Sequence, residues 1–216
     1  MDGIAQQDIA PKKLGPTAYA VLGLLALRDW TTYELAQQME RGVGRMWAAS
    51  PSMLYEEPKH LVARGYATVC QSPVGRRPRA RYSITDAGRQ ALSLWLAEQP
   101  TPPALQFEGL IKVLFADHGP PGTNEAILAE IAAWARQSRT EAQARARGYL
   151  DGNYIDGVDL AARAAIVAQT LAFLAELYDL VERWTAWAAE LAVAPDPADR
   201  AQQAFTAIAD GHRALP

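Results

Sequence analysis

The chain has 216 residues, of which 50% are hydrophobic and 21% are charged, with 15 glycines and 14 prolines. This length and composition suit one large or two modest globular domains, and they exclude a wholly disordered or fibrous protein. A single cysteine excludes an intramolecular disulfide framework and a cysteine-rich zinc module, and it favours a reducing, intracellular setting.

The net charge of −3 hides an asymmetry between the two halves of the chain. Residues 1–100 carry 12 Lys and Arg against 9 Asp and Glu, whereas residues 101–216 carry 9 against 15. A basic first half followed by an acidic second half indicates two modules with different partners. The acidic average does not exclude nucleic-acid binding, because local clustering of positive charge decides that question.

The first hundred residues predict a succession of short elements. Residues 1–15 are polar and unpatterned and are expected to form a flexible arm. Capping residues and helical periodicity then predict helices, and alternation on both sides of a turn-rich segment predicts two strands. The helices are expected at 16–27, about 32–42, about 50–64 and 87–98, and the strands at 66–70 and 80–84. This order is typical of a winged helix-turn-helix with a two-stranded wing, which is therefore assigned to residues 16–98.

A proline-rich linker at residues 99–104 leads into a second segment that is helical throughout, so the fold class is mainly α. Helices are expected at 105–116, about 124–148, 159–191 and about 198–211. In the longest one, two offset sets of apolar residues recur with a heptad-like period, one through Leu174 and Tyr178 and the other through Phe173 and Leu180. Because both faces need burial, residues 105–216 are interpreted as a helical dimerisation domain.

One segment imitates the start of a secretory signal, since Lys12 and Lys13 precede an apolar stretch at residues 18–27. No A-x-A cleavage site follows it, and no apolar run approaches the roughly 18 residues of a membrane span. The stretch is therefore interpreted as a buried core helix. The expected location is the cytoplasm, with no membrane partner.

Four arginines lie within six residues at the predicted hairpin tip, namely Arg76, Arg77, Arg79 and Arg81. Such a tip can pair with phosphates or enter a narrow minor groove, and Pro78 prevents ordinary edge pairing there. The alternative is a solvated edge that blocks aggregation. The position of the cluster, between the third helix and the returning strand, favours contact with DNA.

The third helix is the candidate recognition helix, with an apolar face and an opposite polar face. Its candidate DNA-contacting residues are Ser50, Ser52, Met53, Tyr55, Lys59 and His60. Hydroxyl, ammonium and imidazole groups can bond phosphates or base edges, whereas Glu56 could accept from a cytosine amine but would repel phosphate. Pro58 lies inside the helix and is expected to kink it. The simpler alternative is a polar surface without a ligand.

Catalytic and cofactor patterns are incomplete in this sequence. The glycines at Gly42 and Gly44 lack the third glycine and the preceding strand of a dinucleotide loop. The three histidines fall in different predicted elements without zinc-ligand spacing. Cys70 is expected to be a packed strand residue rather than a nucleophile. The expectation is a protein that is not an enzyme and that holds no cofactor and no metal.

The chain contains six tryptophans, which is many for its length. Core and interface packing explains most of them, and an aromatic-lined pocket for a flat ligand is the functional alternative. Trp95, Trp184 and Trp187 are the candidates for binding a small aromatic effector.

Several short segments stand out when they are taken together. They are Tyr33-Glu34-Leu35, the run from Ser50 to Tyr55, Lys59-x-Leu61-x-x-x-Gly65-Tyr66, and Arg81-Tyr82-x-Ile84-Thr85-x-x-Gly88. Over about residues 14–98 the chain resembles the PadR-like transcriptional regulators. The resemblance implies a homodimeric winged-helix repressor that binds double-stranded operator DNA and, in some members, is released by small, often aromatic effectors. The competing hypothesis is a non-DNA helical module, for protein interaction or small-molecule binding, on a winged-helix scaffold.

Overall fold

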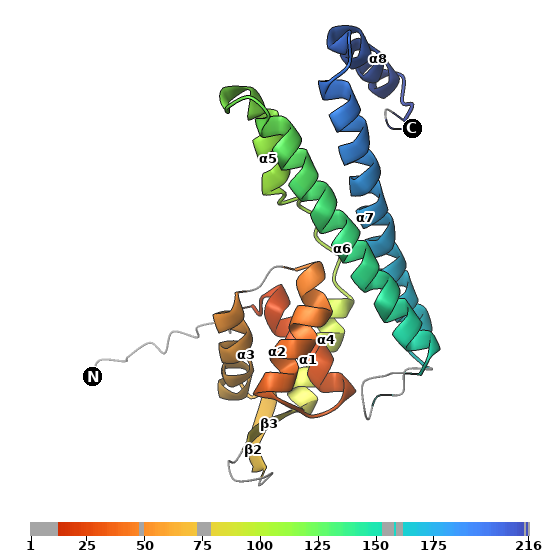
Figure 1. The fold of residues 1–216 in the computed structure, drawn as a ribbon. Coiled ribbons are helices and arrows are strands. Elements are labelled where there is room, and N and C mark those ends of the chain that lie inside the picture. The colour runs from red at the N-terminus through yellow and green to blue at the C-terminus, as the bar shows by residue number, and fades with distance from the viewer. Residues whose placement is uncertain are drawn as a thin grey trace, which may run out of the picture. The chain divides into compact units, whose positions relative to one another are not determined.

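The computed structural model describes residues 13–47, 50–72, 79–152, 158, 162–213 and 215, with the backbone alone for Pro51, Ser72 and Arg79. The chain divides into two compact units, Met1–Thr101 and Pro102–Pro216, and each is described by itself. The first unit combines helices with a small sheet, whereas the described part of the second consists of helices and their connections (Figure 1).

The first unit has the element order of a winged helix-turn-helix. Its elements are α1 (Pro16–Leu27), β1 (Trp30–Thr31), α2 (Thr32–Arg41), the 3-10 helix η1 (Val43–Arg45), α3 (Pro51–Ala63), β2 (Ala67–Ser72), β3 (Arg79–Ile84) and α4 (Asp86–Leu96). The predicted helices and hairpin are confirmed. The sheet, however, has three antiparallel strands in the order β1-β3-β2 instead of two. The additional strand has two residues, which is too short to show alternation in the sequence.

Local capping determines where α2 and α4 begin. The Thr31 hydroxyl accepts from the backbone N–H of Glu34, and the Glu34 carboxylate accepts from the N–H of Thr31, which completes a capping box. The Thr85 hydroxyl accepts from the N–H of Gly88 at the start of α4. Position 88 must be glycine, because a Cβ would collide with the carbonyl oxygen of Tyr66.

The core of the first unit lies between α1, α2, α3 and the sheet. Its fully buried side chains are Val21, Leu22, Leu25, Trp30, Leu35, Met39, Pro58 and Leu61. Each such side chain contributes roughly 1.5–3 kcal/mol by its removal from water. The indole N–H of Trp30 donates to the carbonyl of Leu24 at 2.7 Å, so the polar atom of this buried ring is satisfied. The interpretation of residues 18–27 as part of a core helix is confirmed by the burial of α1.

The second unit is built around two long helices that run antiparallel to each other (Figure 1). Its elements are α5 (Glu108–Leu114), the 3-10 helix η2 (Ala116–His118), α6 (Thr123–Leu150), α7 (Ala164–Ala192) and α8 (Pro197–Ala209). The helix predicted from residue 159 begins at Ala164, and residues 159–161 lie outside the described part of the chain.

α7 covers one of its two apolar faces within the unit and leaves the other exposed. The buried residues of α7 are Leu174, Tyr178, Val181 and Thr185, and the first three pack in clusters with residues of α6. On the other face, the side chains of Ile166, Phe173 and Leu180 are 55%, 65% and 43% exposed. The two predicted apolar sets therefore exist, and this single chain covers only one of them.

The apolar composition of α7 bears on the expectation that the chain has no membrane partner. A window of 18 residues in α7 has a mean hydropathy of 1.5, so by length and composition this helix could cross a bilayer. The expectation that no uninterrupted apolar run reaches the length of a span is not contradicted, because Glu176 and Glu182 interrupt the apolar residues of α7. Only 17% of the window is buried within the structure, and core helices of soluble proteins pass the same test of length and composition.

Candidate nucleic-acid interface

α3 is capped by a serine and presents its polar residues to solvent. The N–H of Met53 donates to the Ser50 hydroxyl at 3.4 Å, and the hydroxyls of Ser50 and Ser52 lie 3.0 Å apart. The exposed residues at and after the cap include Ser50, Ser52, Met53, Tyr55, Glu56, Lys59 and His60. Pro58 and Leu61 are buried on the opposite face. A helix with this arrangement can enter a DNA groove while it stays packed on its own domain.

Pro58 does not interrupt α3. The helix is continuous from Pro51 to Ala63, although Pro58 has no N–H to donate to the carbonyl of Leu54. The proline ring is fully buried in the core. A proline inside a helix costs about 3 kcal/mol, and burial of the apolar ring offsets part of that cost.

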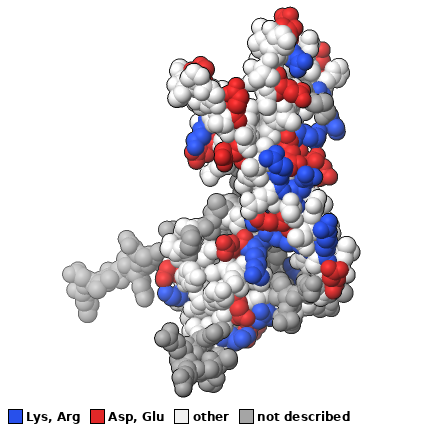
Figure 2. All heavy atoms as spheres, viewed as in Figure 1, with Lys and Arg blue, Asp and Glu red and all other residues white. Residues whose placement is uncertain are grey.

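Each of the two basic side chains of α3 faces a glutamate one turn earlier. The Lys59 ammonium lies 2.6 Å from the Glu56 carboxylate, and Nδ1 of His60 lies 3.9 Å from the Glu57 carboxylate. The hydrogen bond from Lys59 and its charge lower the pKa of Glu56, and the same contact raises the pKa of Lys59. The exposed face of α3 therefore has mixed charge. Acidic and basic side chains are also interspersed over the described residues visible in Figure 2.

The hairpin formed by β2 and β3, called the wing from here on, carries the arginine cluster. Its last pair joins Ser72 to Arg79. Arg76 and Arg77 lie outside the described residues, and of Arg79 only the backbone is described. Arg81 is thus the one arginine of the cluster whose side chain the structure describes.

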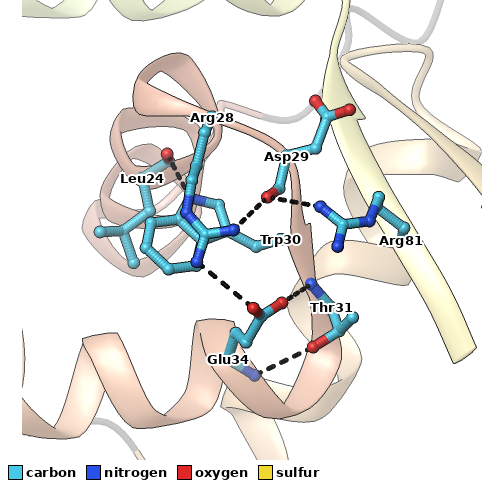
Figure 3. A network of polar contacts seen from close by, with 7 residues as sticks. All are labelled: Leu24, Arg28, Asp29, Trp30, Thr31, Glu34 and Arg81. Atoms are coloured by element: carbon cyan, nitrogen blue, oxygen red, sulfur yellow. Dashed lines mark hydrogen bonds and ion pairs between the residues drawn. The ribbon is translucent and has the colours of Figure 1, made fainter. Parts of the chain in front are cut away.

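The Arg81 side chain contacts the connection between α1 and β1. Its Nη1 donates to the carbonyl oxygen of Asp29 at 3.2 Å, and Nη1 of Arg28 donates to the same oxygen at 3.1 Å (Figure 3). The Asp29–Arg81 contact spans 52 residues of sequence. No local pattern relates two residues so far apart, so sequence reasoning missed this partner and assigned Arg81 to DNA alone.

Arg28 extends this network to the start of α2 (Figure 3). Its guanidinium carbon lies 3.6 Å from the centre of the Trp30 ring, and its Nη2 lies 3.3 Å from Oε1 of Glu34. Burial alone would raise the pKa of Glu34, but the hydrogen bonds from Thr31 and Arg28 outweigh burial, and the pKa is lowered. The network therefore connects the base of the wing to the start of α2.

Cys70 is exposed on β2, which contradicts the expectation of a packed thiol. β2 is an edge strand, and Thr68 and Val69 beside Cys70 are exposed as well. The alternating sequence does not lead to burial here, because the wing extends beyond the helices (Figure 1). Across the described residues, no group of three or more His, Cys, Asp and Glu side chains is placed to hold a metal ion.

The three candidate effector tryptophans are distributed over both units. The ring of Trp95 on α4 stacks on Tyr19 of α1, with ring centroids 4.6 Å apart. Trp184 packs against the core cluster of α6 and α7 and lies edge-on to Phe107, with centroids 6.3 Å apart. Trp187 is partly buried on α7. Packing within each unit accounts for Trp95 and Trp184 without a ligand.

Sequence comparison relates the first unit to known regulators. Residues 21–94 match the transcriptional regulator PadR-like family. The negative transcriptional regulator PadR of Bacillus subtilis is 32% identical over 99 residues, which make up 45% of this chain and 54% of that protein. The matched stretch spans about half the length of the curated relatives.

Solved structures with similar folds cover most of the chain. The PadR-like transcriptional regulator BC1756 from Bacillus cereus has a TM-score of 0.67 at 16% identity, covering 81% of this chain and 96% of that one. Bacillus subtilis PadR in complex with operator DNA has a TM-score of 0.62 at 21% identity, covering 79% and 96%. Its complex with p-coumaric acid has a TM-score of 0.55 at 20% identity, covering 81% and 97%. These likenesses confirm the mainly helical winged-helix fold.

Proposed function

Residues 21–94 form a PadR-like domain, and on this premise we propose that the chain is a cytoplasmic, DNA-binding transcriptional repressor. It binds double-stranded operator DNA as a homodimer. The observation that carries the proposal is α3, whose exposed polar face lies opposite a buried apolar face in a winged-helix domain.

In this proposal α3 enters the major groove and the wing contacts the DNA backbone or the minor groove. The contacting residues on α3 are Ser50, Ser52, Met53, Tyr55, Lys59 and His60, and those of the wing are Arg76, Arg77 and Arg79. Arg81 anchors the base of the wing through the Asp29 carbonyl. Phosphate contacts supply affinity, and contacts to base edges supply sequence preference.

Selection of binding sites from random duplexes, followed by binding measured over a range of salt concentrations, tests this function. The expected result is an enriched sequence with two related half-sites, and a binding constant that falls as salt rises. A protein that enriches no sequence and shows no salt-dependent binding to any duplex would contradict the proposal and favour the non-DNA scaffold.

The homodimer forms through the exposed apolar face of α7. Ile166, Phe173 and Leu180 are unlike the surface of an ordinary monomer, because they repeat along one side of one helix. A second copy presents the same face, so a two-fold axis near this face covers both at once. The winged-helix domains of the two protomers then bind two half-sites at once, which raises the affinity for DNA beyond that of a single domain.

Replacing Phe173 and Leu180 with serine tests this interface. Because both side chains are exposed in the single chain, each protomer should keep its fold while the dimer dissociates, which sedimentation measures. Phe205→Ser on α8, where the side chain is 66% exposed, is the matched control and should stay dimeric. A wild-type chain that sediments as a monomer at micromolar concentration would contradict the homodimer.

A small aromatic effector relieves repression in this proposal. Support comes from the Bacillus subtilis PadR structure with p-coumaric acid, and Trp95, Trp184 and Trp187 stay the candidate binding residues. Typical coupling between two sites is about 1–3 kcal/mol, or roughly 5–150-fold in DNA affinity. Titration with p-coumaric acid and other planar acids, followed by tryptophan fluorescence and DNA binding in parallel, is expected to give a saturable response. If no compound gives a saturable response, the proposed relief of repression by an aromatic effector is wrong.

A further inference from the structure

We infer that Glu56 is a specificity-determining residue of α3, which suppresses binding to random DNA and selects a cytosine at one position of each half-site. This inference rests on the proposed function, because it concerns how the same helix reads DNA. It starts from the charge arrangement on the face that would meet the groove.

The two basic side chains on the exposed face of α3 are both matched by acids of the same helix. Glu56 lies 2.6 Å from Lys59, and Glu57 lies 3.9 Å from His60, each pair separated by three positions. The Glu56 and Lys59 side chains are 53% and 56% exposed, so their contact lies at the surface and not in the core. In the free protein the one ammonium group of α3 is therefore directed at a carboxylate.

This arrangement lowers the affinity of α3 for random DNA. A phosphate approaching Lys59 must compete with Glu56 for the ammonium group, and it is repelled by the same carboxylate. Nonspecific binding consists almost entirely of phosphate contacts, so a carboxylate at this place weakens it selectively. The affinity of the protein for random duplex then depends mainly on the wing arginines.

A suitable base pair reverses the penalty. The N4 amine of cytosine is a donor in the major groove, and a carboxylate on a recognition helix can accept from it. Glu56 then acquires a hydrogen bond and Lys59 is released towards a phosphate or a guanine. The same carboxylate that weakens random binding therefore favours one base, which makes discrimination its main effect.

Glu56→Gln tests the inference against a matched control, Glu108→Gln. Glu108 on α5 pairs with Lys112 at 2.8 Å and is also exposed, so both variants remove one negative charge from a surface ion pair of the same kind. For Glu56→Gln, binding to random duplex should tighten about three- to tenfold. The slope of log K against log salt should steepen by about 0.9, the value for one further phosphate neutralised by Lys59. Glu108→Gln should change neither quantity.

A double variant distinguishes two effects of Glu56, which are its pairing with the Lys59 ammonium and its direct repulsion of phosphate. In Glu56→Gln combined with Lys59→Met the steeper slope should disappear, because no ammonium is left to neutralise the additional phosphate. Persistence of the steeper slope would overturn the masking of Lys59. Glu56→Ala removes the acceptor oxygen that glutamine would keep, so site selection with Glu56→Ala should lose the preference for cytosine at one position of each half-site. Retention of that preference would overturn the selection of cytosine by Glu56.

The outcomes distinguish this inference from the proposed function. If the wild-type protein binds no duplex at all, the proposed function fails. If it binds a selected operator but Glu56→Gln matches the wild type on random duplex, the inference is overturned while the function stands. Equal effects of Glu56→Gln and Glu108→Gln would also overturn it, since they would reflect net charge alone. Melting curves of both variants establish that each is folded.

Discussion

The two units differ in how completely each buries its own apolar side chains. In the first unit, six of the twelve residues of α1 are buried, and Trp30 of β1 is covered by the elements around it. In the second unit neither α5 nor α8 has a buried residue, and Ile111 and Phe173 are at least 60% exposed. The first unit therefore has the larger buried core, although Leu94 and Leu96 of α4 are exposed, and the second unit has more apolar surface that association with another molecule would cover.

Separating the units is the most severe way to break this comparison. A fragment of residues 1–101 should fold as a monomer and bind the selected operator about 10²–10⁴-fold more weakly than the full chain, because two linked half-sites gain from effective concentration. Sedimentation and binding isotherms measure both properties. A fragment that fails to fold, or that dimerises as the full chain does, would show that the first unit is not self-sufficient.

The source of affinity within the first unit can be sharpened by removing the wing arginines. Replacing Arg76, Arg77 and Arg79 with alanine should weaken binding to every duplex and flatten the salt dependence by about 0.9 for each phosphate that is no longer neutralised. Arg89→Ala, an exposed arginine on α4, is the control and should leave the slope unchanged. An unchanged slope in the triple variant would identify the wing as a solvated edge.

Arg81 should behave differently from the other three arginines. Arg81→Ala removes the hydrogen bond to the Asp29 carbonyl, so the free energy of unfolding of the first unit should fall by about 1 kcal/mol. The salt slope should stay the same, because Arg81 is expected to anchor the wing and not to neutralise a phosphate. A slope lowered by about 0.9 together with unchanged stability would return Arg81 to the DNA-contacting set.

The smallest expected effect concerns the stability of the first unit at acid pH. The lowered pKa of Glu34 means that its stabilising contribution is present above its ordinary value of 4.5 and is lost as the pH falls through the folded value. Glu34→Gln should therefore flatten the decline in melting temperature below about pH 4.5. Glu40→Gln, an exposed glutamate on the same helix, is the control. A decline as steep in Glu34→Gln as in the wild type would contradict this role.

Local signals in the sequence were sufficient for most of the first unit. Thr31 and Glu34 form their capping box across three residues, and Thr85 caps α4 across the same distance, so the starts of both helices are written in short segments. The heptad-like spacing on α7 likewise revealed both apolar faces. It could not reveal which face α6 covers, because that depends on packing between helices and not on periodicity.

Contacts between distant segments were beyond the reach of the sequence. The pairing of Trp30 with Tyr82 and the bond from Arg81 to Asp29 each join residues about fifty positions apart, and neither carries a local pattern. Cys70 shows the opposite failure, since a real alternation led to the wrong burial because β2 lies at the edge of the sheet. For the wing tip, the candidate residues Arg76 and Arg77 remain predictions from charge clustering alone.

The exposed face of α7, with Phe173 and Leu180, also affects how operator occupancy depends on the concentration of this protein, if the proposed homodimer forms there. Where free chains outnumber pairs, the concentration of pairs follows the square of the chain concentration by mass action. A threefold fall in copy number would then lower the concentration of the operator-binding species about ninefold. Occupancy of the operator would change over a narrower range of gene expression than for a regulator that acts as a single chain.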